Sequence, residues 1–180
     1  MTAGADVSPL ATASGRFTIA ALDHRDALVA EFERLAADPS ADPAAGGGSG
    51  ANAGVVEALR RFKADVLAAL DAAPIKPSAV MLEPEYSLPD LRDAVPDGVG
   101  VTCALEAQGY FDAPDSGNAV MEGWSPARVS SVGADGAKLL VLYRHDRGEF
   151  TDAQERLVTE VTAQAAEAGV PALIEPVPVD

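Results

Sequence analysis

Five short apolar segments recur along the sequence, and each of them runs directly into charged residues. The segments are nearly continuous rather than alternating, which is typical of strands buried on both faces of a parallel sheet. The acids that follow them include Asp23, Glu83, Glu106 and Glu175. The pattern therefore predicts parallel strands near residues 17–22, 79–82, 99–105, 138–143 and 172–174.

Helical patterns fill the intervals between these segments. Apolar residues recur there at a spacing that places them on one helix face. Asn52 and Ser125 are predicted N-caps, Thr151 opens a capping-box spacing, and Gly169 is expected to end the last helix. The predicted helices span residues 26–36, 55–70, 124–132 and 151–168.

Strands that alternate with helices predict an α/β fold with right-handed crossovers. Two architectures compete: a doubly wound open sheet and a (β/α)8 barrel. The open sheet of the dinucleotide-binding type needs a glycine-rich turn after its first strand, where this chain has Asp23-His24-Arg25. A barrel instead places polar functional residues at the carboxyl ends of its strands. We therefore expect a (β/α)8 TIM-barrel type, incomplete here with about five βα units, and with parallel strands in sequence order.

Composition divides the chain into a short arm and one domain. Residues 1–15 are small and polar, and they are expected to form a flexible N-terminal arm. The domain covers residues 16–180, with a Gly/Ala/Pro-rich surface loop at 38–50.

Charge and cysteine content narrow the class of partner. The 180 residues carry a net charge of −15, which argues against a nucleic-acid or anionic-membrane surface. The lone cysteine, Cys103, excludes an intramolecular disulfide and a cysteine-based zinc cluster. The sequence has no apolar run of about 18 residues and no basic leader, so we expect a cytoplasmic protein.

Four motifs lie at the predicted strand ends, and their order along the chain is informative. They are LDHRDAL at residues 22–28, LEPEY at 82–86, GADGAKLLVLY at 133–143 and LIEP at 173–176. Together they resemble the class I aldolases that cleave tagatose 1,6-bisphosphate, and their relatives that cleave 6-deoxy-6-sulfofructose 1-phosphate. The resemblance runs from residue 17 to the end of the sequence, and the motifs leave the choice between the two subgroups open.

The resemblance implies a (β/α)8 barrel and a Schiff base between a lysine and the substrate ketone, without a metal or other cofactor. It implies catalytic roles for Glu175, Lys138 and Asp23: Glu175 moves protons, and Lys138 contacts the substrate without forming the Schiff base. His24 matches a substrate-binding position at which the family commonly has Gln. Arg144 and Glu83 are further candidates for binding a sugar phosphate.

The resemblance also implies a sixth strand that carries the imine-forming lysine, and the matched motifs end at the fifth. The lysines of this chain are Lys63, Lys76 and Lys138, and the first two are predicted to be solvated. A non-catalytic partial barrel is therefore one alternative. Unpaired outer strands would favour self-association or a complementary chain.

A metal-dependent aldolase or isomerase is the other alternative. His24 and His145 both follow predicted strands, and one of the acids at the strand ends could complete a metal site.

Overall fold

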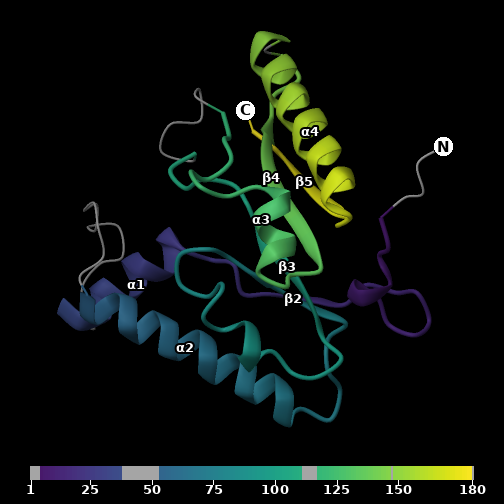
Figure 1. Ribbon diagram of the computed structural model, residues 1–180. Coiled ribbons are helices and arrows are strands. Elements are labelled where there is room, and N and C mark those ends of the chain that lie inside the picture. The colour runs from purple at the N-terminus through teal and green to yellow at the C-terminus, as the bar shows by residue number, and fades with distance from the viewer. Residues whose placement is uncertain (1–4, 38–52, 111–116, 147, 180) are drawn as a thin grey trace.

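The computed structural model describes residues 5–37, 53–110, 117–146 and 148–179. Within them one all-parallel sheet has the strand order β1-β2-β3-β4-β5 (Figure 1). This confirms the predicted α/β class and strand order, and it excludes an open sheet with the first strand in the middle. The strands are β1 (Ile19–Ala21), β2 (Ala79–Leu82), β3 (Gly100–Ala104), β4 (Gly136–Tyr143) and β5 (Ala172–Pro178).

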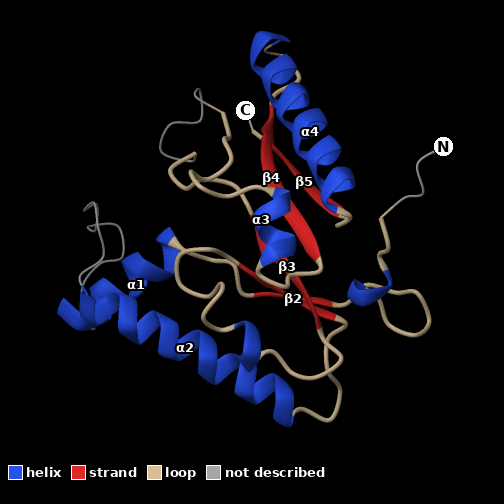
Figure 2. Cartoon of the chain, in the orientation of Figure 1, coloured by secondary structure: helices blue, strands red, loops and turns tan. Residues whose placement is uncertain are grey.

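The sheet curls, and its two faces have different neighbours (Figure 2). Along β4, Leu139 and Val141 belong to the main apolar core, whereas Lys138 and Leu140 line a cavity. Side chains of successive strand residues point to opposite faces, so the core and the cavity lie on opposite sides of the sheet. The fold is a five-stranded half-barrel with helices on its core side.

Helices α2, α3 and α4 cover the core side. Leu67 of α2, Val129 of α3 and Val161 of α4 share one apolar cluster with the strands. Helix α1 lies outside this layer and packs on α2, where Phe32 and Phe62 meet edge to face with ring centroids 5.8 Å apart. No helix in the described ranges is long and apolar enough to cross a membrane. The helices are α1 (Asp26–Ala37), α2 (Ala53–Ala72), α3 (Pro126–Ser131) and α4 (Gly148–Ala168), with 3₁₀ turns η1 (Ser8–Leu10) and η3 (Arg92–Ala94).

Two of the predicted helix ends are confirmed by the structure, and one is wrong. The Ser125 side chain caps α3 by accepting a hydrogen bond from the Arg128 amide, and Gly169 follows α4 with a φ of +71°. Helix α4 begins at Gly148, so the predicted capping box at Thr151 is wrong; the Thr151 hydroxyl instead donates to the Arg144 carbonyl. The predicted cap Asn52 and loop 38–50 lie outside the described residues.

The amino-terminal segment is not a free arm over its described part. Leu10 is 1% exposed, and its carbonyl accepts a hydrogen bond of 2.7 Å from the Ser78 hydroxyl. It lies against Gly100 and Gly136 at the starts of β3 and β4, where a glycine leaves room for it. The composition of residues 1–15, which is small and polar, does not predict that this one leucine is buried.

Candidate functional site

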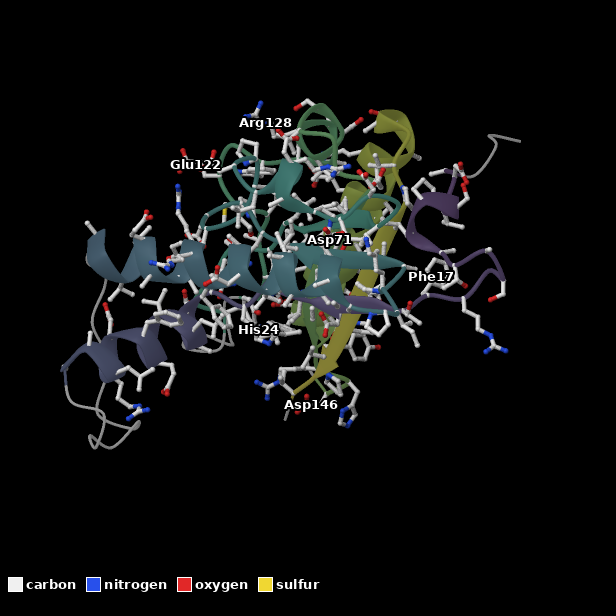
Figure 3. The ribbon with its side chains drawn as sticks, turned by 90° about the horizontal axis from the view of Figure 1, so that it is seen from below. Phe17, His24, Asp71, Glu122, Arg128 and Asp146 are labelled. Atoms are coloured by element: carbon white, nitrogen blue, oxygen red, sulfur yellow. The ribbon has the colours of Figure 1, made fainter. Side chains whose placement is uncertain are left out.

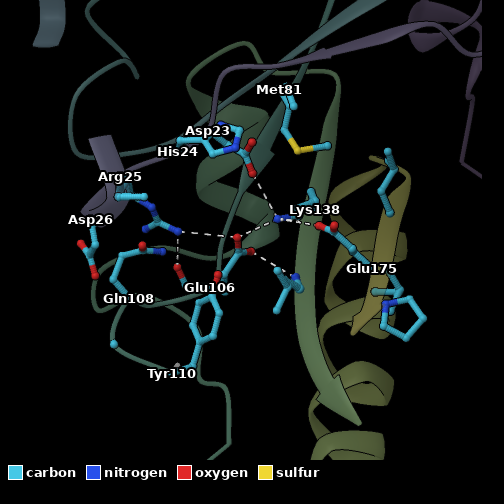
Figure 4. A pocket seen from close by; sticks show the side chains of 17 residues that line it. Asp23, His24, Arg25, Asp26, Met81, Glu106, Gln108, Tyr110, Lys138 and Glu175 are labelled. Atoms are coloured by element: carbon cyan, nitrogen blue, oxygen red, sulfur yellow. Dashed lines mark hydrogen bonds and ion pairs between the residues drawn. The ribbon is translucent and has the colours of Figure 1, made fainter. Parts of the chain in front are cut away.

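A cavity of about 750 Å³ opens where the strands end. Its polar lining includes Asp23 and His24 after β1, Glu106 after β3, Lys138 of β4 and Glu175 of β5 (Figure 4). His24 and Phe17 lie at opposite ends of β1 in Figure 3, which places the cavity at the carboxyl end of that strand. The carboxyl ends of parallel strands are where barrel enzymes build their sites.

Lys138 is the centre of the polar cluster. Its Nζ lies 2.8 Å from Glu106 Oε1, 3.1 Å from Asp23 Oδ2 and 3.0 Å from Glu175 Oε2. Lys138 and Glu106 are almost fully buried, whereas the Glu175 side chain is 54% exposed. Residues from four segments of the chain thus meet at one ammonium group, as the motifs predict for Asp23, Lys138 and Glu175.

The surrounding carboxylates decide the protonation state of Lys138. Burial alone would lower its pKa, but the charges of Glu106 and Asp23 and the hydrogen bond to Glu175 together raise the pKa above its ordinary value. Lys138 is therefore an ammonium ion at neutral pH. It can donate hydrogen bonds and stabilise negative charge, but it is not a nucleophile.

Arg25 and Gln108 hold Glu106 in place. Arg25 is 2% exposed; its Nη2 donates to the Glu106 carbonyl at 2.7 Å and lies 3.6 Å from Glu106 Oε1. The Gln108 amide oxygen, oriented to satisfy its hydrogen bonds, accepts from Arg25 Nη2 at 2.7 Å and Nε at 3.1 Å. Glu106 Oε2 also accepts from the Leu140 amide. Glu106 is thus fixed from both sides, and it fixes Lys138 in turn.

Glu83 and Arg144, two of the predicted substrate-binding residues, do not line this cavity. Glu83 is fully buried and pairs with Lys63, so the prediction of a solvated Lys63 is wrong. Arg144 lies beyond β4, with Nε 3.7 Å from Asp146 Oδ1. Lys76 is partly exposed and pairs with Asp71.

The two histidines do not come together. His24 lines the cavity, whereas His145 is not among its lining residues. The described residues contain no group of three or more His, Cys, Asp or Glu side chains placed to hold a metal ion. The geometry therefore gives no support to the metal-dependent alternative.

Comparisons with known proteins find one group of similar enzymes. No family model matches the chain. The tagatose 1,6-diphosphate aldolase of Streptococcus agalactiae serotype V is 29% identical over 126 residues, which cover 67% of this chain and 35% of the relative. Tagatose 1,6-diphosphate aldolase 2 of Streptococcus pyogenes serotype M3 is 32% identical over 85 residues, or 46% of this chain and 25% of the relative. Over these residues the chain is similar to the tagatose 1,6-diphosphate aldolases. The resemblance inferred from the motifs is confirmed on this side, and the sulfosugar subgroup stays a prediction.

A solved structure shares the fold described above. The crystal structure of Cgl0159 from Corynebacterium glutamicum aligns with a TM-score of 0.56 at 18% identity, covering 94% of this chain and 50% of that one. The chain spans about half of that structure and about a third of the first curated relative. At 18% identity the likeness concerns the fold alone.

Three buried charged residues of the structure, Lys63, Arg25 and Glu106, stand out less clearly in the sequence. Lys63 stands four residues after Leu59 and four before Leu67, both fully buried, so its spacing marks the buried face despite its charge. Arg25 adjoins Asp23 and His24 in the same motif. Glu106 follows the most completely buried strand, β3, whose end had to lie inside the molecule.

Proposed function

We propose that this chain forms the ketose-binding and proton-transfer part of a class I aldolase site within a (β/α)8 barrel. The observation that carries the proposal is the Lys138 ammonium within 3.1 Å of three carboxylates, in the lining of a cavity on the carboxyl side of the sheet. The similarity to tagatose 1,6-diphosphate aldolases supports a ketose phosphate such as tagatose 1,6-bisphosphate as the substrate class. The analogous 6-deoxy-6-sulfofructose 1-phosphate is the second substrate to test.

Aldol cleavage needs a base for the C4 hydroxyl proton and an iminium at C2, and this cluster can supply the base. Breaking the C3–C4 bond of the ketose transfers the C4 hydroxyl proton to a base and leaves the electron pair on C3, where an iminium at C2 delocalises it. Glu175 combines an exposed side chain with an ion pair to Lys138, so it is an accessible candidate for the base. Lys138 can donate to an oxygen of the substrate from the same position.

The imine-forming amine must come from residues other than the three lysines of this chain. Lys138 is held as an ammonium ion, Lys63 is fully buried and does not line the cavity, and Lys76 lies in the exposed pair with Asp71. We therefore propose that the active enzyme needs further βα units, in the same polypeptide or in a complementary chain. In this arrangement the half-barrel binds the sugar and carries out the proton transfer.

The charge of the cavity indicates which part of the substrate it takes. Its lining has four carboxylates, Asp23, Asp26, Glu106 and Glu175, against two cations, Arg25 and Lys138. This excess of negative charge disfavours a phosphate group. The polyol and ketone carbons are the better match, and the phosphate groups are expected to bind beyond the described lining.

Binding and trapping experiments test the proposal together. The purified chain is titrated with tagatose 1,6-bisphosphate and with dihydroxyacetone phosphate, following the lysine and histidine NMR signals. The signals of Lys138 and His24 should move, and those of Lys76 and His145 should not. Glu175→Gln should weaken the response, whereas the exposed control Glu122→Gln should not.

Borohydride treatment in the presence of dihydroxyacetone phosphate provides the second readout. The chain alone should show no covalent adduct by mass spectrometry, because its cavity offers no neutral amine. Absence of any NMR response to either sugar phosphate would overturn the binding proposal. An adduct on Lys138 would overturn the assignment of that residue as a permanent ammonium ion.

A further inference from the structure

Lys63 and Glu83 form a buried ion pair that the proposed reaction does not use. Both side chains are fully buried, and Lys63 Nζ donates to Glu83 Oε1. Lys63 belongs to α2 on the core side of the sheet, and Glu83 follows β2. An isolated buried charge is costly, so such a pair persists only where its remaining hydrogen bonds are satisfied.

The other two hydrogen bonds of Lys63 are unusual in their targets. Nζ donates to the Leu22 carbonyl at 3.0 Å and to the His24 carbonyl at 3.0 Å. These carbonyls belong to the residues on either side of Asp23. The ammonium therefore has three acceptors for its three N–H groups, and two of them fix the backbone around Asp23.

Glu83 is anchored just as fully on its far side. Its Oε2 accepts from the Glu85 amide at 2.7 Å and the Tyr86 amide at 3.0 Å, and Oε1 accepts from the Ser87 hydroxyl at 2.6 Å. The Tyr86 ring lies 5.8 Å from Lys63 Nζ. The pair thus connects the segment after β1 to the turn after β2 through buried, saturated hydrogen bonds.

This connection bears directly on the cavity. Asp23 Oδ2 lies 3.1 Å from Lys138 Nζ, and the next residues, His24 and Arg25, also line the cavity. We infer that Lys63, held in place by Glu83, is a positioning residue, which keeps the Leu22–Arg25 segment where Asp23 faces Lys138. Its catalytic meaning rests on the proposed function, but the placement of Asp23 can be measured without any ligand.

The test uses the three lysines of the full chain as probes. With ¹³C,¹⁵N-labelled lysine, the side chains of Lys63, Lys76 and Lys138 each give one NMR signal, and Lys76→Met assigns and controls for the exposed one. In the double variant Lys63→Met/Glu83→Gln both charges are removed, while the new amide oxygen at position 83 can still accept from the amides of residues 85 and 86. Asp23 should then withdraw, and the Lys138 side-chain signal should shift at neutral pH, because one of its three carboxylate partners has moved away. The Lys76 signal should stay where it is.

The single variant Glu83→Gln separates positioning from pair electrostatics. It keeps Lys63 and its two carbonyl bonds, so the Lys138 signal should match that of the unmodified chain. Three results would overturn the inference: an unchanged Lys138 in the double variant, an equal shift in both variants, or a double variant that does not fold while Glu83→Gln does. The third result would show that the pair holds the fold and not the site. A failure of sugar phosphates to bind would overturn the proposed function and leave this result standing.

Discussion

Glu106 and Glu175 both form ion pairs with Lys138, but their side chains differ in burial. Glu106 is 2% exposed and is held by Arg25 and the Leu140 amide, whereas the Glu175 side chain is 54% exposed. A buried ion-pair partner supports the fold, and an exposed one is free to meet a substrate. At the scale of single residues the site therefore separates a buried carboxylate from an exposed one, and the exposed one is the base that we propose.

Substituting each glutamate by glutamine should expose this difference. Glu106→Gln should lower the free energy of unfolding by about 3 kcal/mol, because it leaves the buried cations Lys138 and Arg25 short of a counter-charge. Glu175→Gln should lower it by less than about 1 kcal/mol, since solvent already screens that pair. Urea unfolding followed by circular dichroism measures both. Equal losses would contradict the assignment of separate roles.

Alkaline pH should destabilise the fold. Burial is the main cause that raises the pKa of Cys103, Tyr86 and Tyr110, and the nearby carboxylates raise the pKa of Lys138 against the effect of burial. The unfolded chain then loses these protons first, so stability falls as pH rises above the ordinary cysteine value of 9.0.

Lys63 acts in the opposite direction, because burial lowers its pKa. Below the ordinary lysine value of 10.5 the unfolded chain holds that proton more tightly, so this one group favours folding as pH rises. The urea midpoint, measured from about pH 8 to about pH 11, should decline beyond about pH 9, because four groups outweigh one. A midpoint that stays level or climbs across this range would show that the four groups are not shifted as described.

At the scale of elements, continuous apolar runs predict the strands, whereas a buried charge cannot be recognised from its residue type. Strand β2 has the predicted bounds, and β1 is shorter than predicted, with Phe17 outside it and 55% exposed. The sequence predicts a solvent-exposed Lys63, because charged residues rarely face a core. Its partner Glu83 is distant in the sequence, so only the fold could bring the two together. The same limit applies to Leu10, whose burial depends on two glycines far along the chain.

The contact of the amino-terminal segment with β3 can be tested at Gly100. A Cβ there would lie 2.1 Å from the Pro9 carbonyl oxygen, so either the segment or the strand must move. Gly100→Ala should lower the free energy of unfolding by about 1–3 kcal/mol and raise protease cleavage within residues 5–15. Gly148→Ala is the matched control, because nothing lies within 4 Å of its added Cβ. If both variants resist unfolding and proteolysis equally, the segment is not held by this contact.

At the scale of the whole molecule, the half-barrel has two outer strands with unequal edges. β1 is three residues long, whereas β5 pairs with β4 over seven residues and has no partner on its other side among the described residues. Which strand edge can pair with another strand depends on which of its backbone N–H and C=O groups point outward. Apolar patterning predicts that a strand is buried, but it does not predict how many N–H groups its open edge offers. The edge of β5 is where a second chain would add.

The prolines of β5 restrict that edge. Val179 donates to the Tyr143 carbonyl and Pro171 accepts from Ala137, so the odd-numbered residues of this segment face β4. Alternate residues of a strand point their backbone groups to opposite edges, which leaves residues 172, 174, 176 and 178 for the open side. Residues 176 and 178 are prolines without an N–H group. Pairing with an added strand can therefore use only the amides of Ala172 and Ile174.

This restriction makes self-association sensitive to one position. We expect two copies of the chain to pair through the first half of β5, giving a mass in solution above the monomer value of 18.4 kDa. Ile174→Pro removes an amide that faces the open edge and leaves the bonds to β4 intact, so sedimentation velocity should show a shift to monomer. Ile174→Ala loses the same side-chain packing and keeps the amide, so it should associate as the unmodified chain does. An unmodified chain that is monomeric at all concentrations would contradict the expectation, and equal behaviour of the two variants would show that the side chain, not the strand edge, makes the contact.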